Sequence, residues 1–288
     1  FNDDKKLLTF CDSVQDAAHR AGFFGARTWR FNLRVALQRV VNDAGEGVPL
    51  ADLPARFVEW WRLYPREEIK SDADFVCAFL APNMTWFQDF EALQQAGELP
   101  PGSNLLRDVE RRIAWEVMNE YGLQARIGRS LPRTRCSTAA VDDELLERAV
   151  QRLIEPLRNE VGGLRELTPD ALRVYLLGLL THLQERGGIL HTGLPQRYVE
   201  SGGGDTYVFQ NLHHLPDYGR NSRLPELLAD RPGTKRFDPL SSGSRSRPSW
   251  NERWFAATLG RTAQLVGEPA EAFALVLPAL VEAGVLDE

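Results

Sequence analysis

Apolar residues recur every three or four positions along most of this chain, and that helical period restricts the fold more than any other feature of the sequence. The clearest run places Leu105, Val109, Ile113, Val117 and Tyr121 four residues apart, which puts them on one face of an α-helix. Segments with strand-like patterns are short. We therefore predict a mainly α-helical chain.

Proline, glycine and capping residues divide the periodic segments into separate helices. Thr168 followed by Pro169 is a typical helix start, because threonine caps the first turn and proline needs no hydrogen-bond partner there. Gly22 and Gly25 are expected to interrupt the first helix, and Gly122 is expected to end another as a C-cap. Turns are predicted at Pro49 and Pro54, and helices at residues 13–21, 28–41, 57–64, 72–80, 85–93, 104–121, 142–161, 168–186, 252–266 and 269–283.

Length and composition narrow the class of protein. A chain of 288 residues exceeds the size of most single hydrophobic cores, which predicts two or three packed units. No apolar run approaches the ~20 residues that cross a bilayer, so we expect no membrane partner. A net charge of −6 argues against a protein that coats nucleic acid with its whole surface.

The three cysteines, Cys11, Cys77 and Cys136, are too far apart for a CxxC metal knuckle, and their odd number is typical of reduced thiols in a cytosol. We expect a cytoplasmic protein. Cys11 and Cys77 lie in apolar stretches, which predicts that they are inert core thiols.

The patterns that usually carry catalysis are absent. The sequence contains no GxxxxGK[ST] phosphate loop, no GxSxG nucleophile elbow and no HExxH zinc motif. The adjacent His213 and His214 would point in different directions on any regular element. We therefore predict neither a catalytic residue nor a metal site in this chain.

The N-terminal residues predict a strand, a tight turn and a helix. Residues 5–11 form a short apolar run behind a charged entry, as buried strands of parallel sheets do. Asp12 and Ser13 end this run. Ser13 then forms a capping box with Asp16, which starts the first predicted helix.

This segment also carries a family pattern. Residues 7–22 fit the pattern FxDxxQDAxxxAG at Phe10, Asp12, Gln15, Asp16, Ala17, Ala21 and Gly22. The segment resembles the motif IV region of the second RecA-like domain in large bacterial superfamily 2 DEAD/DEAH-box helicases, of the kind found in phage-defence loci. The match covers about residues 1–41.

The resemblance implies that this element faces a nucleic-acid strand, while ATP and magnesium bind the parent enzyme between its two RecA-like domains. Asp12, Ser13, Gln15 and Asp16 match the polar positions of the pattern and are implied to lie at the nucleic acid. A helix N-terminus with free N–H groups is also a natural phosphate site. No cofactor is expected in this segment itself, and no QxxGRxGR motif follows it.

Three basic places are further candidates for contact with nucleic acid, and each has an ordinary structural alternative. The first is the start of the predicted helix 28–41, which could instead be a solvated helix face. The second is a predicted hairpin wing, which could instead pack against protein. The third is an irregular basic stretch, which could instead be a solvated loop. The residues are Arg27 and Arg30 in the first, Arg197 and Tyr207 in the second, and Lys235, Arg236, Arg245 and Arg247 in the third. A fourth arginine-rich segment, residues 125–136, contains four arginines and no acid and is predicted to be a loop.

The order of predicted elements indicates winged-helix-like units. Two helices, a short strand and a hairpin follow one another over residues 137–210. At residues 283–286 a helix is predicted to run through glycine into a short apolar strand, as at residues 186–190. This repeat predicts a second unit that lacks its wing. The predicted domains are a RecA-like strand–helix edge at 1–41, a helical insert at 42–136, a winged-helix-like unit at 137–210, a basic linker at 211–250 and a truncated winged-helix-like unit at 251–288.

Taken together, the sequence favours a piece of an ATP-dependent helicase or translocase that guides or separates nucleic-acid strands, with DNA favoured, and that does not itself hydrolyse ATP. Its partners would be the nucleic acid and the remainder of the parent helicase. One alternative is a winged-helix DNA-binding regulator, whose base-reading candidates on helix 168–186 would be Arg173, Thr181, His182 and Gln184. Another is a helical protein-interaction scaffold of a defence complex, favoured by the acidic charge and by the aromatic-rich residues 57–90.

Overall fold

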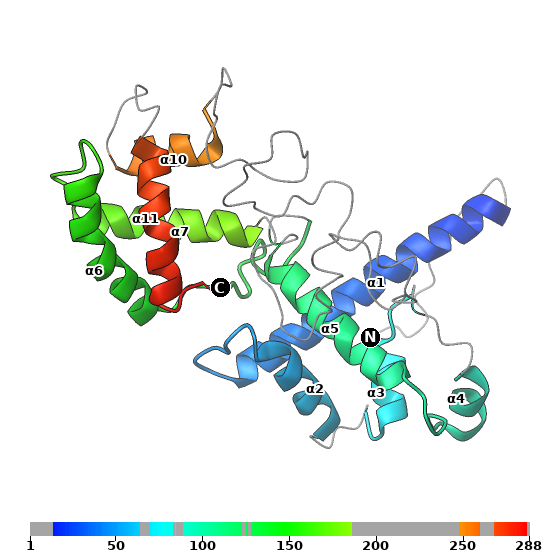
Figure 1. Ribbon diagram of the computed structural model, residues 1–288. Coiled ribbons are helices and arrows are strands. Elements are labelled where there is room, and N and C mark those ends of the chain that lie inside the picture. Colours follow the sequence, from blue (N-terminus) through cyan, green and yellow to red (C-terminus); the bar gives the residue numbers. More distant parts are fainter. Residues whose placement is uncertain are drawn as a thin grey trace. The chain divides into compact units, whose positions relative to one another are not determined.

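The computed structural model describes residues 14–63, 69–82, 84, 89–122, 125, 128–185, 248–259 and 268–286, and of residues 14–27, 90, 94, 268 and 270 it describes the backbone alone. These ranges consist of helices and connecting turns, with no strand among them (Figure 1). The prediction of a mainly α-helical chain is therefore confirmed. In chain order the helices are α1 (Val14–Asp43), α2 (Leu53–Leu63), α3 (Asp72–Phe79), α4 (Phe90–Ala96), α5 (Leu105–Tyr121), α6 (Asp143–Glu160), α7 (Pro169–Glu185), α10 (Trp250–Thr258) and α11 (Glu268–Glu282).

The chain divides into two compact units. Unit 1 consists of residues 1–117 and 191–217, and unit 2 consists of residues 118–190 and 218–288. Unit 1 therefore contains α1 to α4 and most of α5, whereas unit 2 contains the end of α5 together with α6, α7, α10 and α11.

The first helix differs from its prediction. Gly22 and Gly25 were expected to separate two helices, but α1 continues through both and spans 30 residues. Glycine in a helix interior costs only about 1 kcal/mol relative to alanine, and alanine-rich sequence around these two glycines offsets that cost. α1 is described from Val14 onward, and the predicted N-cap Ser13 lies outside the described residues.

Aromatic side chains form the core of unit 1. Phe57 and Trp61 of α2 pack against Phe79 of α3, with ring centroids 4.9 Å apart for Phe57 and Phe79 and 5.5 Å apart for Trp61 and Phe79. Trp60 donates a hydrogen bond of 2.9 Å from its indole N–H to the Asp43 carboxylate at the end of α1. The helices predicted at 57–64 and 72–80 are thus confirmed, although α2 already begins at Leu53 and includes Pro54, which was expected in a turn. The aromatic side chains of this part are interior.

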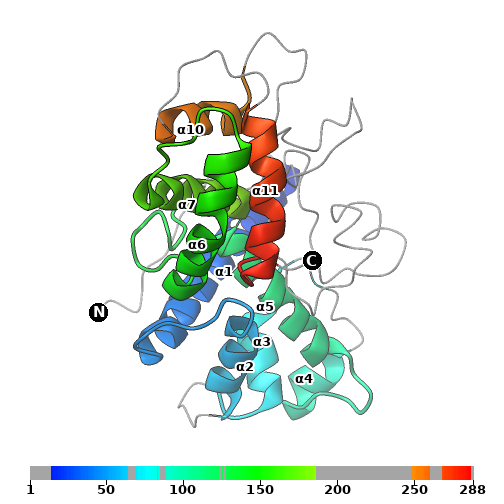
Figure 2. The same ribbon diagram turned by 60° about the vertical axis from the view of Figure 1, so that its left-hand side comes forward.

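Leucine side chains form the core of unit 2. α7 packs against α6 on one side and α10 on another, and α11 packs against α6 and α10 (Figure 2). Fully buried residues of this core include Leu153 of α6, Leu176 of α7, Phe255 of α10 and Leu280 of α11. Each of these four helices overlaps a segment where the sequence predicted a helix.

Several predicted helix starts are confirmed by their caps. The Asp142 carboxylate accepts hydrogen bonds from the N–H groups of Glu144 and Leu145 at 2.9 and 3.0 Å. The Thr168 hydroxyl accepts one from Ala171 at 3.2 Å, directly before Pro169. These contacts satisfy N–H groups that a helix cannot satisfy internally.

Two helix ends and one helix cap differ from their predictions. α4 extends to Ala96, three residues beyond the predicted end, and the left-handed Gly97 stops it. α10 ends at Thr258, well before the predicted Val266. Gly122 follows α5 without a left-handed backbone, so it is not the C-cap that was expected.

A close approach explains Gly122. A Cβ at this position would lie 2.7 Å from the Met118 carbonyl oxygen and 3.4 Å from the Gln184 carbonyl oxygen. The Gln184 side chain also donates a 2.6 Å hydrogen bond to the Tyr121 carbonyl. Glycine therefore allows the end of α5 to contact the end of α7.

The predicted C-terminal strand segment is a helix cap. Gly284 has φ of +76°, the Val285 N–H donates to the Leu280 carbonyl and the Gly284 N–H donates to the Val281 carbonyl, both at 2.9 Å. This pair of hydrogen bonds is the Schellman motif, which reverses the chain after a helix. The prediction that residues 283–286 lead into a strand is wrong.

The remaining predicted elements lie outside the described residues. They are the strand at 5–11, the hairpin around residues 197–209 and the irregular stretch at 211–247. Of the cysteines, Cys77 and Cys136 are exposed free thiols, so the prediction of a core position for Cys77 is wrong. Partial burial, and next the nearby Asp74 carboxylate, raise the pKa of the Cys77 thiol, so the thiol is protonated at neutral pH.

Candidate functional site

The residues predicted to contact nucleic acid are described to different degrees. Asp12, Ser13, Arg197, Tyr207, Lys235, Arg236, Arg245 and Arg247 lie outside the described residues. Gln15, Asp16 and Arg27 belong to α1, where the backbone alone is described. Arg30 is the one whose side-chain contacts are described.

The continuity of α1 changes how its basic residues are arranged. Arg20 and Arg27 belong to one unbroken helix with Arg34, not to two helices separated by glycines. Seven residues make almost two turns, so these three positions share one face of α1 and are separated by steps of about 10.5 Å along its axis. This alignment was not predicted, because the sequence was expected to form two separate helices here.

Arg30 takes part in a buried charged cluster between α1 and α5. Its Nε atom lies 3.9 Å from the Glu116 carboxylate, and the Nε of Arg112 donates a 2.9 Å hydrogen bond to the same carboxylate. The Arg112 and Glu116 side chains are only 5% and 4% exposed, whereas Arg30 is 39% exposed. One guanidinium group is thus interior while the other reaches the surface.

Two tryptophan rings enclose the interior guanidinium. Arg112 lies 5.1 Å from the ring centroid of Trp29 and 5.7 Å from that of Trp115. The Trp29 indole donates a 3.2 Å hydrogen bond to the Phe79 carbonyl, which joins α1 to α3. Cation–π contacts of this kind are strongest where water is excluded. Trp29 and Arg112 therefore hold α1 against α5, and Arg30 lies at the edge of this contact.

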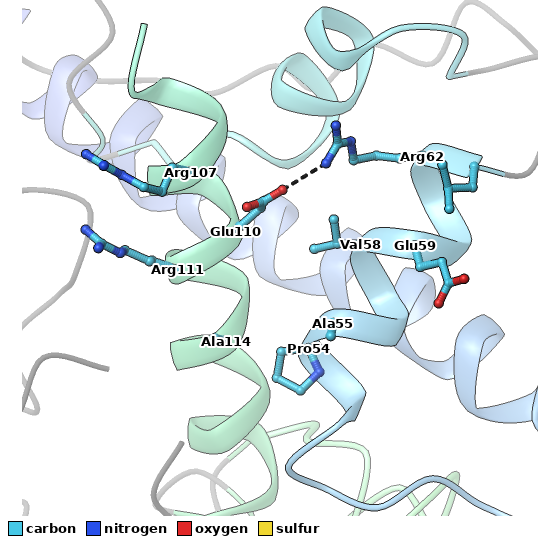
Figure 3. A pocket seen from close by; sticks show the side chains of 10 residues that line it. Pro54, Ala55, Val58, Glu59, Arg62, Arg107, Glu110, Arg111 and Ala114 are labelled. Carbon is cyan, nitrogen blue, oxygen red and sulfur yellow. Dashed lines mark hydrogen bonds and ion pairs between the residues drawn. The ribbon is translucent and has the colours of Figure 1, made fainter. Parts of the chain in front are cut away.

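A groove of about 500 Å³ lies between α2 and α5 of unit 1 (Figure 3). Pro54, Ala55 and Val58 of α2 and Ala114 of α5 form its apolar part, and Leu63 at its rim is 71% exposed. The Arg62 side chain crosses toward α5 and pairs with Glu110 at 3.0 Å. The groove is thus apolar at one end, and an ion pair joins its two walls at the other.

Two arginines extend from α5 beside this groove. Figure 3 shows Arg107 and Arg111 pointing from α5 to the side opposite α2. Neither has an ion pair within the described residues, whereas Arg62 is engaged by both Glu110 and Asp72. No sequence pattern predicted this groove, because the residues of its two walls lie about 50 positions apart in the chain and alternate with core positions.

The residues that a winged-helix regulator would use to read bases are mostly occupied inside unit 2. Arg173 pairs with Asp143 at 2.7 Å, and Gln184 contacts the end of α5 as described above. His182 is buried, and its ring stacks on Trp250 at 3.7 Å. The most exposed side chains of α7 include the apolar Val174 and Leu177, which suit a base-reading face poorly.

Other kinds of site find no support in the part of the chain that the structure describes. There, no three side chains of histidine, cysteine, aspartate or glutamate are grouped as metal ligands. A search of the same residues also finds no helix that is long and apolar enough to span a membrane.

Comparison with known proteins adds no relative. No family model, no curated protein and no solved structure matches the chain.

Proposed function

We propose that the chain belongs to an ATP-dependent nucleic-acid helicase or translocase, in which it guides or separates strands while ATP hydrolysis occurs elsewhere in the parent enzyme. The observation that carries the proposal is the N-terminal pattern from Phe10 to Gly22, whose positions from Gln15 to Gly22 lie in the single helix α1. The parent enzyme would bind ATP and magnesium and act in the cytoplasm.

The finer fold assignment is part of this proposal. Residues 1–41 would be the strand–helix edge of a RecA-like domain, and the rest would be a helical insert with winged-helix-like units. The helical character of the described residues supports a long insert of this kind. The predicted strand at residues 5–11 would need the remainder of a RecA-like sheet beside it.

At the site itself, the N-terminus of α1 would bind a phosphate, with Ser13 as a hydroxyl donor and the N–H groups of the first turn around it. Asp12, Gln15 and Asp16 would orient the strand and the neighbouring loops. Arg27 lies more than three turns further along the same helix. The strand would therefore run along α1 rather than across its end.

The test compares two substitutions that differ only in charge. Ser13→Glu places a carboxylate where the phosphate would bind, and Ser13→Gln has the same shape without the charge. By fluorescence anisotropy with single-stranded and forked DNA, we expect Ser13→Glu to weaken binding about tenfold relative to Ser13→Gln. Equal affinities of the two variants, or ATP hydrolysis by the chain alone, would contradict the proposal.

A helical protein-interaction scaffold remains a second candidate, and the groove between α2 and α5 is the observation that favours it. An exposed Leu63 beside an apolar groove is the arrangement that accepts an amphipathic helix. Binding partners recovered after nuclease treatment, and lost on substitution of Val58 by arginine, would favour this function over strand guiding.

A further inference from the structure

The arginine-rich loop at residues 128–136 has a defined fold. The Ser130 hydroxyl donates a 2.6 Å hydrogen bond to the Ala125 carbonyl, and the Thr134 N–H donates to the Ser130 carbonyl at 2.9 Å. The Cys136 N–H donates to the Leu131 carbonyl at 3.0 Å. These hydrogen bonds close successive turns and fix the backbone of the segment, for which the sequence predicted only a loop.

A buried carboxylate anchors this loop to α5. The Leu131 N–H donates a hydrogen bond of 2.6 Å to Glu120 of α5, and the Glu120 side chain is buried. Ser130 and Leu131 are buried as well. A buried carboxylate forms a strong hydrogen bond with its donor. The Glu120 carboxylate therefore holds the loop in place against α5.

The loop directs its basic side chains outward. Arg129 and Arg135 are exposed, and neither has an ion pair within the described part of the chain. Arg135 has φ of +59°, a left-handed backbone that non-glycine residues adopt at a cost. The fold therefore tolerates local strain to place a guanidinium group here, in a loop that contains no acid.

A polar pocket of about 500 Å³ adjoins the loop. Hydroxyl and amide groups of Thr138, Thr181 and Gln184 line it beside Arg133. Glu185 also lines it, so the pocket suits an uncharged polar group better than an anion. Protein interfaces depend on apolar and aromatic anchors at their centre, and this pocket offers a partner little of either.

We propose that residues 128–136 bind the phosphate backbone of a nucleic-acid strand, with Arg129 and Arg135 contacting phosphates and the adjoining pocket receiving an uncharged sugar or base edge. Guanidinium groups suit phosphates because their planar N–H donors match the oxygens in pairs. The ordered backbone lowers the entropy cost of binding. This inference rests on the proposed function, since it requires nucleic acid to be a ligand of the chain.

The experiment removes the two arginines and compares the result with an equal loss of charge elsewhere. In the loop variant Arg129→Ala/Arg135→Gly, glycine removes the side chain and also suits the left-handed backbone. The control variant Arg148→Ala/Arg165→Ala removes two exposed arginines of the same unit. Arg129→Lys/Arg135→Lys retains the charge without the planar donors, and circular dichroism verifies that each variant is folded.

Anisotropy with a single-stranded oligonucleotide of about 20 nucleotides, titrated at several salt concentrations, gives the affinity and its salt slope. We expect the loop variant to bind about tenfold more weakly and to lower the slope by about 2, since each lost phosphate contact lowers it by about 1. The lysine variant should retain the slope but lose part of the affinity. The control variant should bind like the wild type.

Each other outcome has a definite meaning. DNA binding that the loop variant leaves unchanged, or that the control variant weakens equally, overturns this inference but not the proposed function. Absence of DNA binding by the wild type overturns both. Competition by poly-glutamate as effective as that by DNA of equal charge, lost in the loop variant, would assign the loop to an acidic protein and also overturn the inference.

Discussion

Replacement of Gly178 by alanine tests the packing of unit 2. A glycine-to-alanine substitution inside a helix usually stabilises a protein, but here we expect it to destabilise the chain. Gly178 lies within α7, where Trp254 of α10 covers it. The Trp254 indole donates a 3.0 Å hydrogen bond to the Tyr175 carbonyl, and its ring stacks near Trp250. Glycine leaves the space that this indole fills.

The magnitude follows from the geometry. A Cβ at Gly178 would lie 2.2 Å from Cε2 and Cζ2 of Trp254, about 1.3 Å closer than the ~3.5 Å at which carbon atoms make favourable contact. Overpacking of a core costs about 1–3 kcal/mol, and a displaced Trp254 also loses its hydrogen bond to Tyr175, worth about 1 kcal/mol. Alanine regains about 1 kcal/mol of helix propensity, so we expect a net loss of about 2 kcal/mol.

Urea denaturation followed by tryptophan fluorescence measures this change in the free energy of unfolding. The same substitution in a chain without Trp254 shows whether the indole causes the loss. In a Trp254→Leu chain the indole is absent, so Gly178→Ala should there be neutral or stabilise by up to about 1 kcal/mol. A stabilising effect of Gly178→Ala in the wild type, or the same loss in both backgrounds, would refute the proposed packing of α10 on α7.

Three further predictions concern unit 1. Glu116→Gln should destabilise the chain by about 3–5 kcal/mol in urea titrations, because it leaves the buried Arg112 guanidinium without its counter-charge; a loss below about 1 kcal/mol would contradict this. Hydrogen bonds from the Lys70 N–H and next from the Ser71 hydroxyl lower the pKa of Asp74 below its ordinary 3.8, so the carboxylate stabilises α3 above that pH and the contribution is lost as the pH falls through the lower folded-state pKa. Asp74→Asn should remove this part of the acid dependence in melting curves, and an unchanged profile would rule the contribution out. Leu63→Glu should change stability by less than about 0.5 kcal/mol, since the side chain is 71% exposed; a larger loss would mean that the rim of the groove is packed in solution.

Local signals in the sequence identified most helices of the described fold. Asp142 and Thr168 both cap the helices they were expected to start, and the period from Leu105 to Tyr121 marks α5. The predictions were wrong at several glycines, whose effect was inferred from the residue type alone. Gly25 lies inside a helix, and Gly284 closes a Schellman motif instead of leading into a strand.

The contacts of the candidate site could not be predicted from the sequence, because they join residues that lie far apart in the chain. Arg30 was identified as a basic surface residue, but its contact with Glu116 depends on how α1 and α5 pack. The order of the loop at residues 128–136 likewise depends on the buried carboxylate of Glu120 in α5. Neither partner has a local pattern that distinguishes it from an ordinary charged helix residue.

The central claim, that this chain guides nucleic acid without hydrolysing ATP, is tested most directly by the salt dependence of its affinity for single-stranded DNA. The account predicts binding by the isolated chain that weakens steadily as salt rises, with a slope that reflects several phosphate contacts, and no ATP hydrolysis in the presence of DNA. No measurable affinity for DNA at low salt would contradict it.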